Sequence, residues 1–165
     1  MRTTLNQIRA HSPCQDGWTK LLRGLNKTAA DDEPLWIDEV LNISGLDDAL
    51  WCLRAVEGCD REIRLYAVWC ARRVQHLMVD ARSVAALDVA ERHARGGASD
   101  EELAASSSAA SWAASWAARW AAAGRAALAA AAAAARLASA GRDTERAAQA
   151  EELRRMCSEM REAKP

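Results

Sequence analysis

Residues 99–120 read SDEELAASSSAASWAASWAARW, and this stretch decides which fold the chain can adopt. Ser99 and Glu102 have the spacing of a capping box, in which each side chain accepts from the other residue's backbone N–H group, so a helix is expected to begin there. Trp112, Trp116 and Trp120 then recur every four residues. Because four residues turn about 400° around a helix, the three indoles share one face. The stretch therefore predicts a helix that carries a tryptophan stripe.

Alanine surrounds this stripe and continues beyond it. Alanine has the highest helix propensity, and its small side chain lets neighbouring helices approach closely. The chain contains seven Trp, one Tyr and no Phe, so Trp supplies most of the large apolar volume. Burying one indole removes about 150 to 250 Å² from water. We expect the stripe to clamp the alanine-rich part onto the N-terminal helices; the alternative is a partner-binding stripe, because Trp is frequent among interface hot spots.

Helical periodicity also dominates outside this stretch, and strand signals are absent. Trp18, Leu21, Leu22 and Leu25, for example, are spaced to form one apolar helix face. The sequence therefore predicts an all-α fold, a multi-helix bundle of about seven to nine helices with a C-terminal alanine-rich helical hairpin or bundle packed on the N-terminal helices through Trp. We expect residues 1–97 to form several short amphipathic helices and residues 99–165 to form an alanine-rich part with long helices. The two parts are expected to fold together as one cooperative domain.

Caps, glycines and prolines indicate where the helices begin and end. A straight helix from residue 99 to residue 140 would be about 63 Å long, more than a compact domain of this size is wide. Gly124 is therefore expected to break it, unless the helix protrudes. The predicted segments are residues 15–25; a helix capped by Asp32 with Pro34 in its first turn; a helix opened by Ser44 and Asp47 and stopped by Gly58; Asp60–Met78; residues 80–95, ended by Gly96 and Gly97; and, beyond a boundary at Gly141, a last helix capped by Asp143 or Thr144 with the apolar stripe Ala150, Leu153, Met156, Cys157 and Met160.

The formal net charge of −1 conceals an acidic segment, residues 31–62, which carries a charge of about −8. A nearly neutral chain lacks the strongly basic face that counterion-driven binding requires, so nucleic-acid binding is disfavoured. The acidic segment is either a solvated helix surface or a face that docks onto a basic partner protein and accelerates the encounter. In the second interpretation the partner-binding residues are Asp31, Asp32, Glu33, Asp38, Glu39, Asp47 and Asp48.

Motifs for catalysis, metal binding and cofactor binding are missing from the sequence. The three histidines, His11, His76 and His93, stand apart, and neither HExxH nor CxxC nor a glycine-rich phosphate loop occurs. Five cysteines without tight spacing suggest neither a disulfide framework nor a zinc site. We expect no enzyme activity, no cofactor and no metal. The alternative is an enzyme or a small-molecule-sequestering protein, and it requires a deep polar pocket between the N-terminal helices.

The first residues, MRTTLNQIRAHSP, lack the apolar core of a signal peptide. The alanine run 129–135 is too weakly hydrophobic, and too closely flanked by Arg125 and Arg136, to predict a membrane span. Reduced thiols and the absence of both signals favour the cytoplasm of a bacterial host cell.

Three segments in order resemble a known protein family. They are AVWCARRVQHLM at residues 67–78, AALDVAERHARG at residues 85–96 and ASDEEL at residues 98–103, followed by the long alanine runs. This pattern resembles an alanine-rich helical family of immunity proteins and uncharacterised phage proteins, over about residues 45 to 160. The resemblance implies a helical fold and a phage or mobile-element setting, and it transfers no catalytic residue.

Together these features favour a non-enzymatic inhibitor that binds another bacterial protein stoichiometrically. Its target would be a host defence effector, as for an anti-CRISPR protein. A toxin-neutralising immunity protein is the first alternative. The second is a structural self-assembly module in which the alanine-rich part pairs with its own copy, for example as a homodimer. The acidic segment or exposed Trp side chains would carry the contact.

Overall fold

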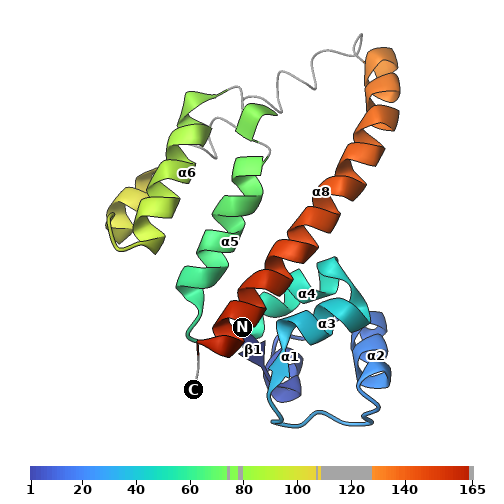
Figure 1. Cartoon of the computed structure of the whole chain (residues 1–165). Helices are drawn as coiled ribbons and strands as arrows, with labels where there is room; N and C mark the ends of the chain where they lie inside the picture. Colours follow the sequence, from blue (N-terminus) through green and yellow to red (C-terminus); the bar gives the residue numbers. More distant parts are fainter. Residues whose placement is uncertain (74, 78–79, 107, 109–127, 164–165) are drawn as a thin grey trace. The chain divides into compact units, whose positions relative to one another are not determined.

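The computed structural model describes residues 1–73, 75–77, 80–106, 108 and 128–163. Within these ranges the chain is almost entirely helical, which confirms the predicted all-α class (Figure 1). Residues 100–106 are also helical. Among the described helices, none has the length and apolar character of a membrane span.

The elements are β1 (Arg2–Thr3), α1 (Leu5–Ala10), α2 (Gln15–Gly24), β2 (Leu35–Trp36), α3 (Ile37–Ser44), α4 (Leu46–Cys52), the 3-10 turn η1 (Leu53–Ala55), α5 (Asp60–Arg73), the 3-10 turn η2 (Gln75–Leu77), α6 (Ala81–Ala94) and α8 (Leu128–Glu162).

The backbone contacts divide the chain into two compact units. Unit 1 consists of Met1–Asp60 together with Glu145–Pro165, and unit 2 consists of Arg61–Thr144. The last turns of α8 thus belong with the N-terminal helices, although about a hundred residues separate them in sequence. The compositional boundary between residues 97 and 99, and the cooperativity of the whole chain, stay predictions.

A two-stranded antiparallel ladder begins unit 1. Arg2 pairs with Trp36 and Thr3 with Leu35, and the backbone N–H of Ile37 donates to the carbonyl of Met1 at 3.1 Å. The predicted helix start at Asp32 and Pro34 is therefore wrong, because pairing with β1 keeps Leu35–Trp36 extended and α3 begins only at Ile37. Tertiary hydrogen bonding overrides the local capping signal here.

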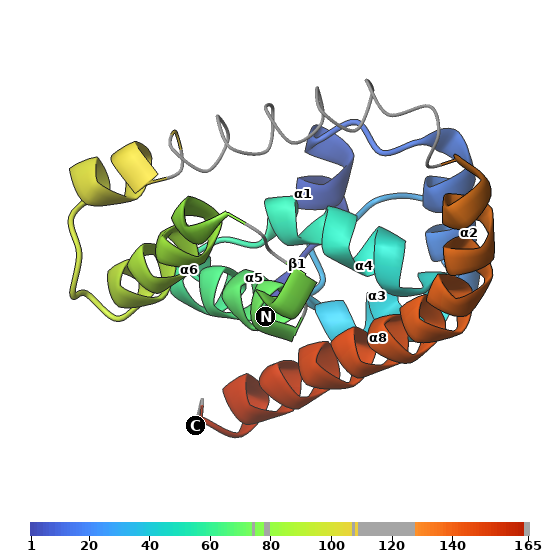
Figure 2. The same ribbon diagram turned by 90° about the horizontal axis from the view of Figure 1, so that it is seen from above.

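Helices α2, α3 and α4 lie next to one another and form the core of unit 1 (Figure 2). Ile37, Val40 and Ala49 are fully buried between them. The predicted capping pair of Ser44 and Asp47 is wrong: Ser44 ends α3, and Gly45, at a φ of 91°, caps α4. A positive φ is accessible to glycine without a steric penalty, so one residue suffices to redirect the chain between the two helices. Helix α4 ends at Cys52, before Gly58 is reached.

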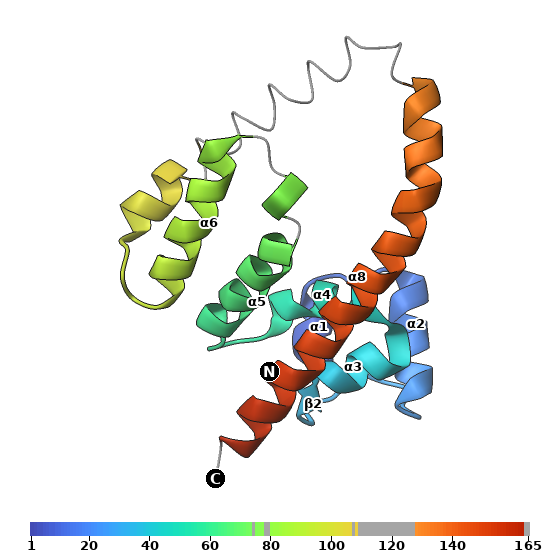
Figure 3. The same cartoon turned by 45° about the horizontal axis from the view of Figure 1, so that its top comes forward.

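The C-terminal part of α8 packs across α3 and α4 (Figures 1 and 3). Leu153 and Cys157, one turn apart on α8, are both 0% exposed, which confirms two members of the predicted apolar stripe. The predicted boundary at Gly141 is wrong, because α8 runs through it. A single glycine inside a helix costs only about 1 kcal/mol relative to alanine, too little to end a helix that good helix formers continue on both sides. Polar contacts frame the buried pair: Arg146 to Asp47 at 2.7 Å, Arg154 to Asn42 at 3.3 Å and Arg161 to Asp38 at 2.9 Å.

In unit 2, α5 and α6 lie side by side (Figure 3). Arg72 of α5 joins them through ion pairs to Asp88 at 2.5 Å and Glu91 at 3.1 Å on α6. The predicted segment Asp60–Met78 is shorter as a helix: α5 ends at Arg73, and a 3-10 turn follows. Asp80 caps α6, and its hydrogen bonds from the side chain and backbone of Arg82 lower its pKa to about 2.

The end of α6 and the start of the next helix follow the sequence pattern. Gly96, at a φ of 78°, terminates α6 as predicted, and the N–H of Gly97 donates to the carbonyl of Arg92 at 2.7 Å. The predicted capping box is confirmed by two bonds, from the Ser99 N–H to the Glu102 carboxylate at 3.1 Å and from the Glu102 N–H to the Ser99 hydroxyl at 3.2 Å. The tryptophan stripe of Trp112, Trp116 and Trp120, the clamp or hairpin built on it and the break at Gly124 lie outside the described residues.

We predict that Gly24→Ala destabilises the protein. A Cβ at residue 24 would lie 2.3 Å from Cγ2 of Ile43, so α2 and α3 would have to separate. Overpacking of this kind typically costs about 1 to 3 kcal/mol, which thermal unfolding followed by circular dichroism would register as a lower Tm. Gly141→Ala is the matched control: a Cβ there meets nothing within 4 Å, so its Tm is expected to rise slightly. An unchanged Tm for Gly24→Ala would contradict the close α2–α3 contact.

Leu153→Ala is expected to loosen the last turns of α8 from unit 1. The side chain is 0% exposed, so its truncation leaves a cavity and should lower the free energy of unfolding by about 2 to 5 kcal/mol in urea titrations. Arg155→Ala, on the exposed side of the same helix, is the control and should change it by less than about 1 kcal/mol. If the two substitutions lowered the free energy of unfolding equally, the buried side chain of Leu153 would not be what holds α8 to unit 1.

Candidate recognition groove

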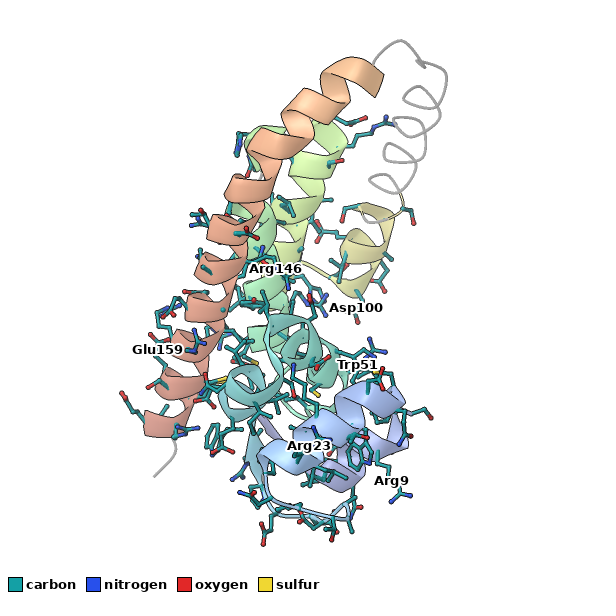
Figure 4. The ribbon with its side chains drawn as sticks, turned by 90° about the vertical axis from the view of Figure 1, so that its right-hand side faces the viewer. Arg9, Arg23, Trp51, Asp100, Arg146 and Glu159 are labelled. Carbon is teal, nitrogen blue, oxygen red and sulfur yellow. The ribbon has the colours of Figure 1, made fainter. Side chains whose placement is uncertain are left out.

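An apolar groove opens in unit 1 between α1, α2, α3 and α4, with a volume of about 200 Å³. This volume exceeds the roughly 150 Å³ of an engineered apolar cavity that admits benzene. Figure 4 shows Trp51 on α4, above the two blue helices α1 and α2. We call this feature the α2–α4 groove. Its walls are Ile8, Pro13, Cys14, Gly17, Trp18, Leu21, Val40, Ser44, Asp48, Trp51 and Cys52.

The local sequence of α2 shapes one wall of the groove. Cys14 caps this helix, and its Sγ accepts from the N–H of Gly17 at 3.4 Å. The spacing of Gly17, Trp18 and Leu21 directs these three residues to the same side of the helix. Because Gly17 has no side chain, space remains beside Asp48. A Cβ on residue 17 would lie 3.7 Å from the carboxylate of Asp48 and 3.1 Å from Sγ of Cys14. The glycine thus holds the groove open at its acidic end.

Ser44 places an unsatisfied polar group in the wall. The residue is 8% exposed, and its hydroxyl is buried with no hydrogen-bond partner among the described residues. Its backbone carbonyl, in contrast, accepts from Nζ of Lys20 at 2.7 Å. A buried hydroxyl without a partner costs about 1 to 3 kcal/mol, so a ligand that satisfies it would gain affinity.

Among the described residues, Asp48 supplies the one carboxylate of the groove wall, and it is half-buried. It forms no ion pair within the described ranges, whereas the adjacent Asp47 pairs with Arg146. Two basic side chains of α2 and η1 donate to backbone carbonyls of groove residues: Nζ of Lys20 to Ser44 at 2.7 Å and Nε of Arg54 to Trp51 at 2.9 Å. Asp48 can therefore accept a hydrogen bond from a cation that a ligand supplies.

Two half-buried indoles border the groove. The guanidinium of Arg54 stacks on the ring of Trp51, 4.5 Å from its centroid, and holds it in place. The periodicity of residues 15–25 predicts Trp18 as part of an apolar face, which the structure bears out, but does not show that this face remains partly open. From the sequence, Trp18 and Trp51 could each be core residues. Only the structure shows that they line the same groove from two different helices.

Two of the five thiols line the groove, and their environments differ. Cys14 is exposed, whereas Cys52 is buried. Burial, with a smaller effect from the negative charge of Asp48, raises the pKa of Cys52 to about 12. Burial also raises the pKa of Cys157, on the buried face of α8. Both buried thiols therefore stay protonated at neutral pH and are poor nucleophiles.

The seven predicted partner-binding acids do not form one free acidic face. Asp31 and Glu33 both pair with Lys27, at 2.5 Å and 2.6 Å. Asp38 pairs with Arg161, which also stacks on Trp36 at 4.4 Å from the ring centroid. Asp47 pairs with Arg146 at 2.7 Å. The other three acids, Asp32, Glu39 and Asp48, have no ion pair within the described part of the chain. Basic side chains of unit 1 thus pair with four of the seven.

A second hollow in unit 1, of about 560 Å³, lies beside the β1–β2 ladder, and its lining includes Arg2, Thr3, Gln7, Trp36 and Glu57. The residues described there show neither a nucleophile paired with a base nor an unpartnered buried polar atom. Among the described residues, no group of three or more His, Cys, Asp or Glu side chains is placed to hold a metal ion. His93 lies in unit 2, where it contacts Asp100 at 2.7 Å. The α2–α4 groove is therefore the strongest candidate site.

Comparison with known proteins does not assign the chain to a family. No family model, no curated protein and no solved structure matches it.

The thiol environments predict selective alkylation. In the native protein at about pH 8, N-ethylmaleimide should label Cys14 well before Cys52, because the first is exposed and the second is buried with a raised pKa. Peptide mapping by mass spectrometry at successive times would measure both rates. Unfolding in urea is the control and should bring the two rates together. Comparable labelling in the native state would contradict the placement of Cys52 in the core.

Proposed function

We propose that this chain is a non-enzymatic recognition protein of the inhibitor type, which binds a partner protein stoichiometrically through the α2–α4 groove. The observation that carries the proposal is one open apolar groove bordered by Trp18 and Trp51, with an unpaired carboxylate, Asp48, in its wall. Tryptophan is enriched among the few residues that dominate binding energy at protein interfaces, especially around apolar pockets.

The size of the groove favours a protein side chain over a larger organic ligand. Pockets for drug-sized molecules and cofactors usually enclose about 300 to 1,000 Å³. The groove encloses about 200 Å³, which corresponds to one large side chain. A side chain that enters it would remain attached to a segment lying over α2 and α4, and that segment would supply the rest of the interface area.

The ion pairs of unit 1 reduce the number of acidic side chains that could attract a basic partner. Since Lys27, Arg146 and Arg161 already pair with four of the acids, long-range attraction for a basic partner is weaker than the acidic segment alone suggests. Asp48 lies where a contact with the partner would be partly shielded from water. We therefore expect Asp48 to contribute to the choice of partner through a short-range contact, and the affinity for the partner to depend only modestly on salt concentration.

The biological setting of the proposal rests on the family resemblance. On that basis the partner is a bacterial protein in the cytoplasm, either a host defence effector or, in the alternative, a toxin that the chain neutralises. Assembly with a second copy is the competing proposal, and analytical ultracentrifugation of the pure chain would reveal it as a concentration-dependent dimer.

The test is quantitative capture of the partner by groove variants. Immobilised wild-type chain, Trp51→Ala and Trp69→Ala are exposed to the same bacterial lysate, and each retained protein is quantified by mass spectrometry. A specific partner should be retained at least about tenfold less by Trp51→Ala, because a hot-spot truncation costs about 2 kcal/mol or more. Trp69→Ala changes a tryptophan of unit 2 and should retain the partner fully. Circular dichroism confirms that each variant is folded, and equal retention by all three chains would refute the groove as the binding site.

A further inference from the structure

We propose that the α2–α4 groove accepts a tyrosine side chain of the partner protein, flanked in the partner's sequence by a lysine or arginine that pairs with Asp48. This inference rests on the proposed function and names the chemistry of the partner at the same site. It follows from the apolar volume of the groove, the unpartnered hydroxyl of Ser44 and the unpaired carboxylate of Asp48, taken together.

The volume and lining of the groove select a ring. An engineered apolar cavity of roughly 150 Å³ accommodates benzene, and the groove has about 200 Å³. Aliphatic side chains from three helices, Ile8, Leu21 and Val40, contribute to its walls, and Trp18 and Trp51 border it. Indole faces and edges interact favourably with another aromatic ring in stacked or edge-to-face geometry. A single six-membered ring therefore fits both the space and its surroundings.

Ser44 selects a ring with a polar tip. Ser44 is one of the residues that line the groove, and its hydroxyl is buried with no partner within the described residues, so the hydroxyl must rotate about χ1 to meet an occupant. A phenol can both donate to and accept from a serine hydroxyl, whereas the ring of phenylalanine would leave that hydroxyl unsatisfied. Sites that hydrogen-bond a hydroxyl discriminate strongly against an analogue that lacks it. Tyrosine is accordingly preferred over phenylalanine.

Asp48 selects a cation beside the ring. The carboxylate is half-buried, and the missing Cβ of Gly17 leaves space next to it. Lys20 and Arg54 donate to the backbone carbonyls of Ser44 and Trp51, and the adjacent Asp47 pairs with Arg146. Within the described residues, none of these three basic side chains forms an ion pair with Asp48. A lysine or arginine next to the partner's tyrosine can reach the carboxylate while the ring stays in the groove.

The experiment uses the full chain and tripeptides as probes. N-acetyl-Lys-Tyr-Lys-amide is titrated to about 10 mM while the indole N–H signals of Trp18 and Trp51, assigned through their Phe variants, are followed by NMR. A saturable shift with a Kd of about 1 mM is expected for so short a segment. The Lys-Phe-Lys and Glu-Tyr-Glu analogues should each bind at least about fivefold more weakly, because each loses one polar contact.

Matched variants assign each contact to its residue. Ser44→Ala should abolish the preference for tyrosine over phenylalanine and leave the preference for lysine over glutamate. Asp48→Asn should do the reverse. Asp47→Asn alters the neighbouring acid, which Arg146 already neutralises, and should leave both preferences unchanged.

Several results would overturn the inference without touching the proposed function. Absence of any saturable shift up to about 10 mM would overturn it, as would preferences that persist in Ser44→Ala and Asp48→Asn. Tyramine presents the same ring and a cation without a peptide backbone. If tyramine binds more tightly than the Lys-Tyr-Lys tripeptide, the groove is a site for a free arylalkylamine and not for a protein segment. The capture experiment with Trp51→Ala is independent of these probes: if partner retention depends on the groove while no tripeptide binds, only the tyrosine assignment fails.

Discussion

Two side chains one turn apart on α8, Leu153 and Cys157, are completely buried in a core that is otherwise made by the first sixty residues, and the rest of unit 1 depends on this contact. The N-terminal helices are short, so their own faces enclose little apolar surface. Covering α3 and α4 with the last turns of α8 completes the core. The surrounding polar contacts of Arg146, Arg154 and Arg161 set the direction of α8 over that surface more than they add stability, since exposed ion pairs contribute little.

Helix α3 links this core to the candidate site. Asp38 and Asn42 contact α8, while Val40 and Ser44 line the α2–α4 groove. Buried on several sides, α3 has little freedom to shift, and a rigid wall keeps a binding groove from collapsing in the absence of a ligand. The unsatisfied hydroxyl of Ser44 is maintained within this rigid setting. That local cost is the basis of the proposed preference for tyrosine, whereas the proposed function itself rests on the groove, its two indoles and Asp48.

Much of the fold could be predicted from the sequence, and the exceptions share a physical cause. The ends of α6 and the capping box at Ser99 were predictable because Asp80, Gly96 and Glu102 act on backbone groups a few residues away. The start of α3 was not, because pairing of β2 with Arg2–Thr3 involves residues more than thirty positions distant. The helix through Gly141 has a different cause: one glycine costs only about 1 kcal/mol, and the strong helix propensity of the residues around it outweighs that cost.

The sequence by itself determined the all-α class, the positions of α2 and α6, the start of α5 and the absence of recognisable catalytic motifs, because these depend on local propensity, periodicity and residue type. It also showed which acids are present, but not which remain unpaired. Only the tertiary structure decided that four of the seven candidate acids have basic partners, that Trp18 and Trp51 border one groove, and that the hydroxyl of Ser44 lies buried in its wall. Each of these facts depends on residues from separate helices meeting in space, and such meetings are set by long-range packing, which one sequence does not reveal.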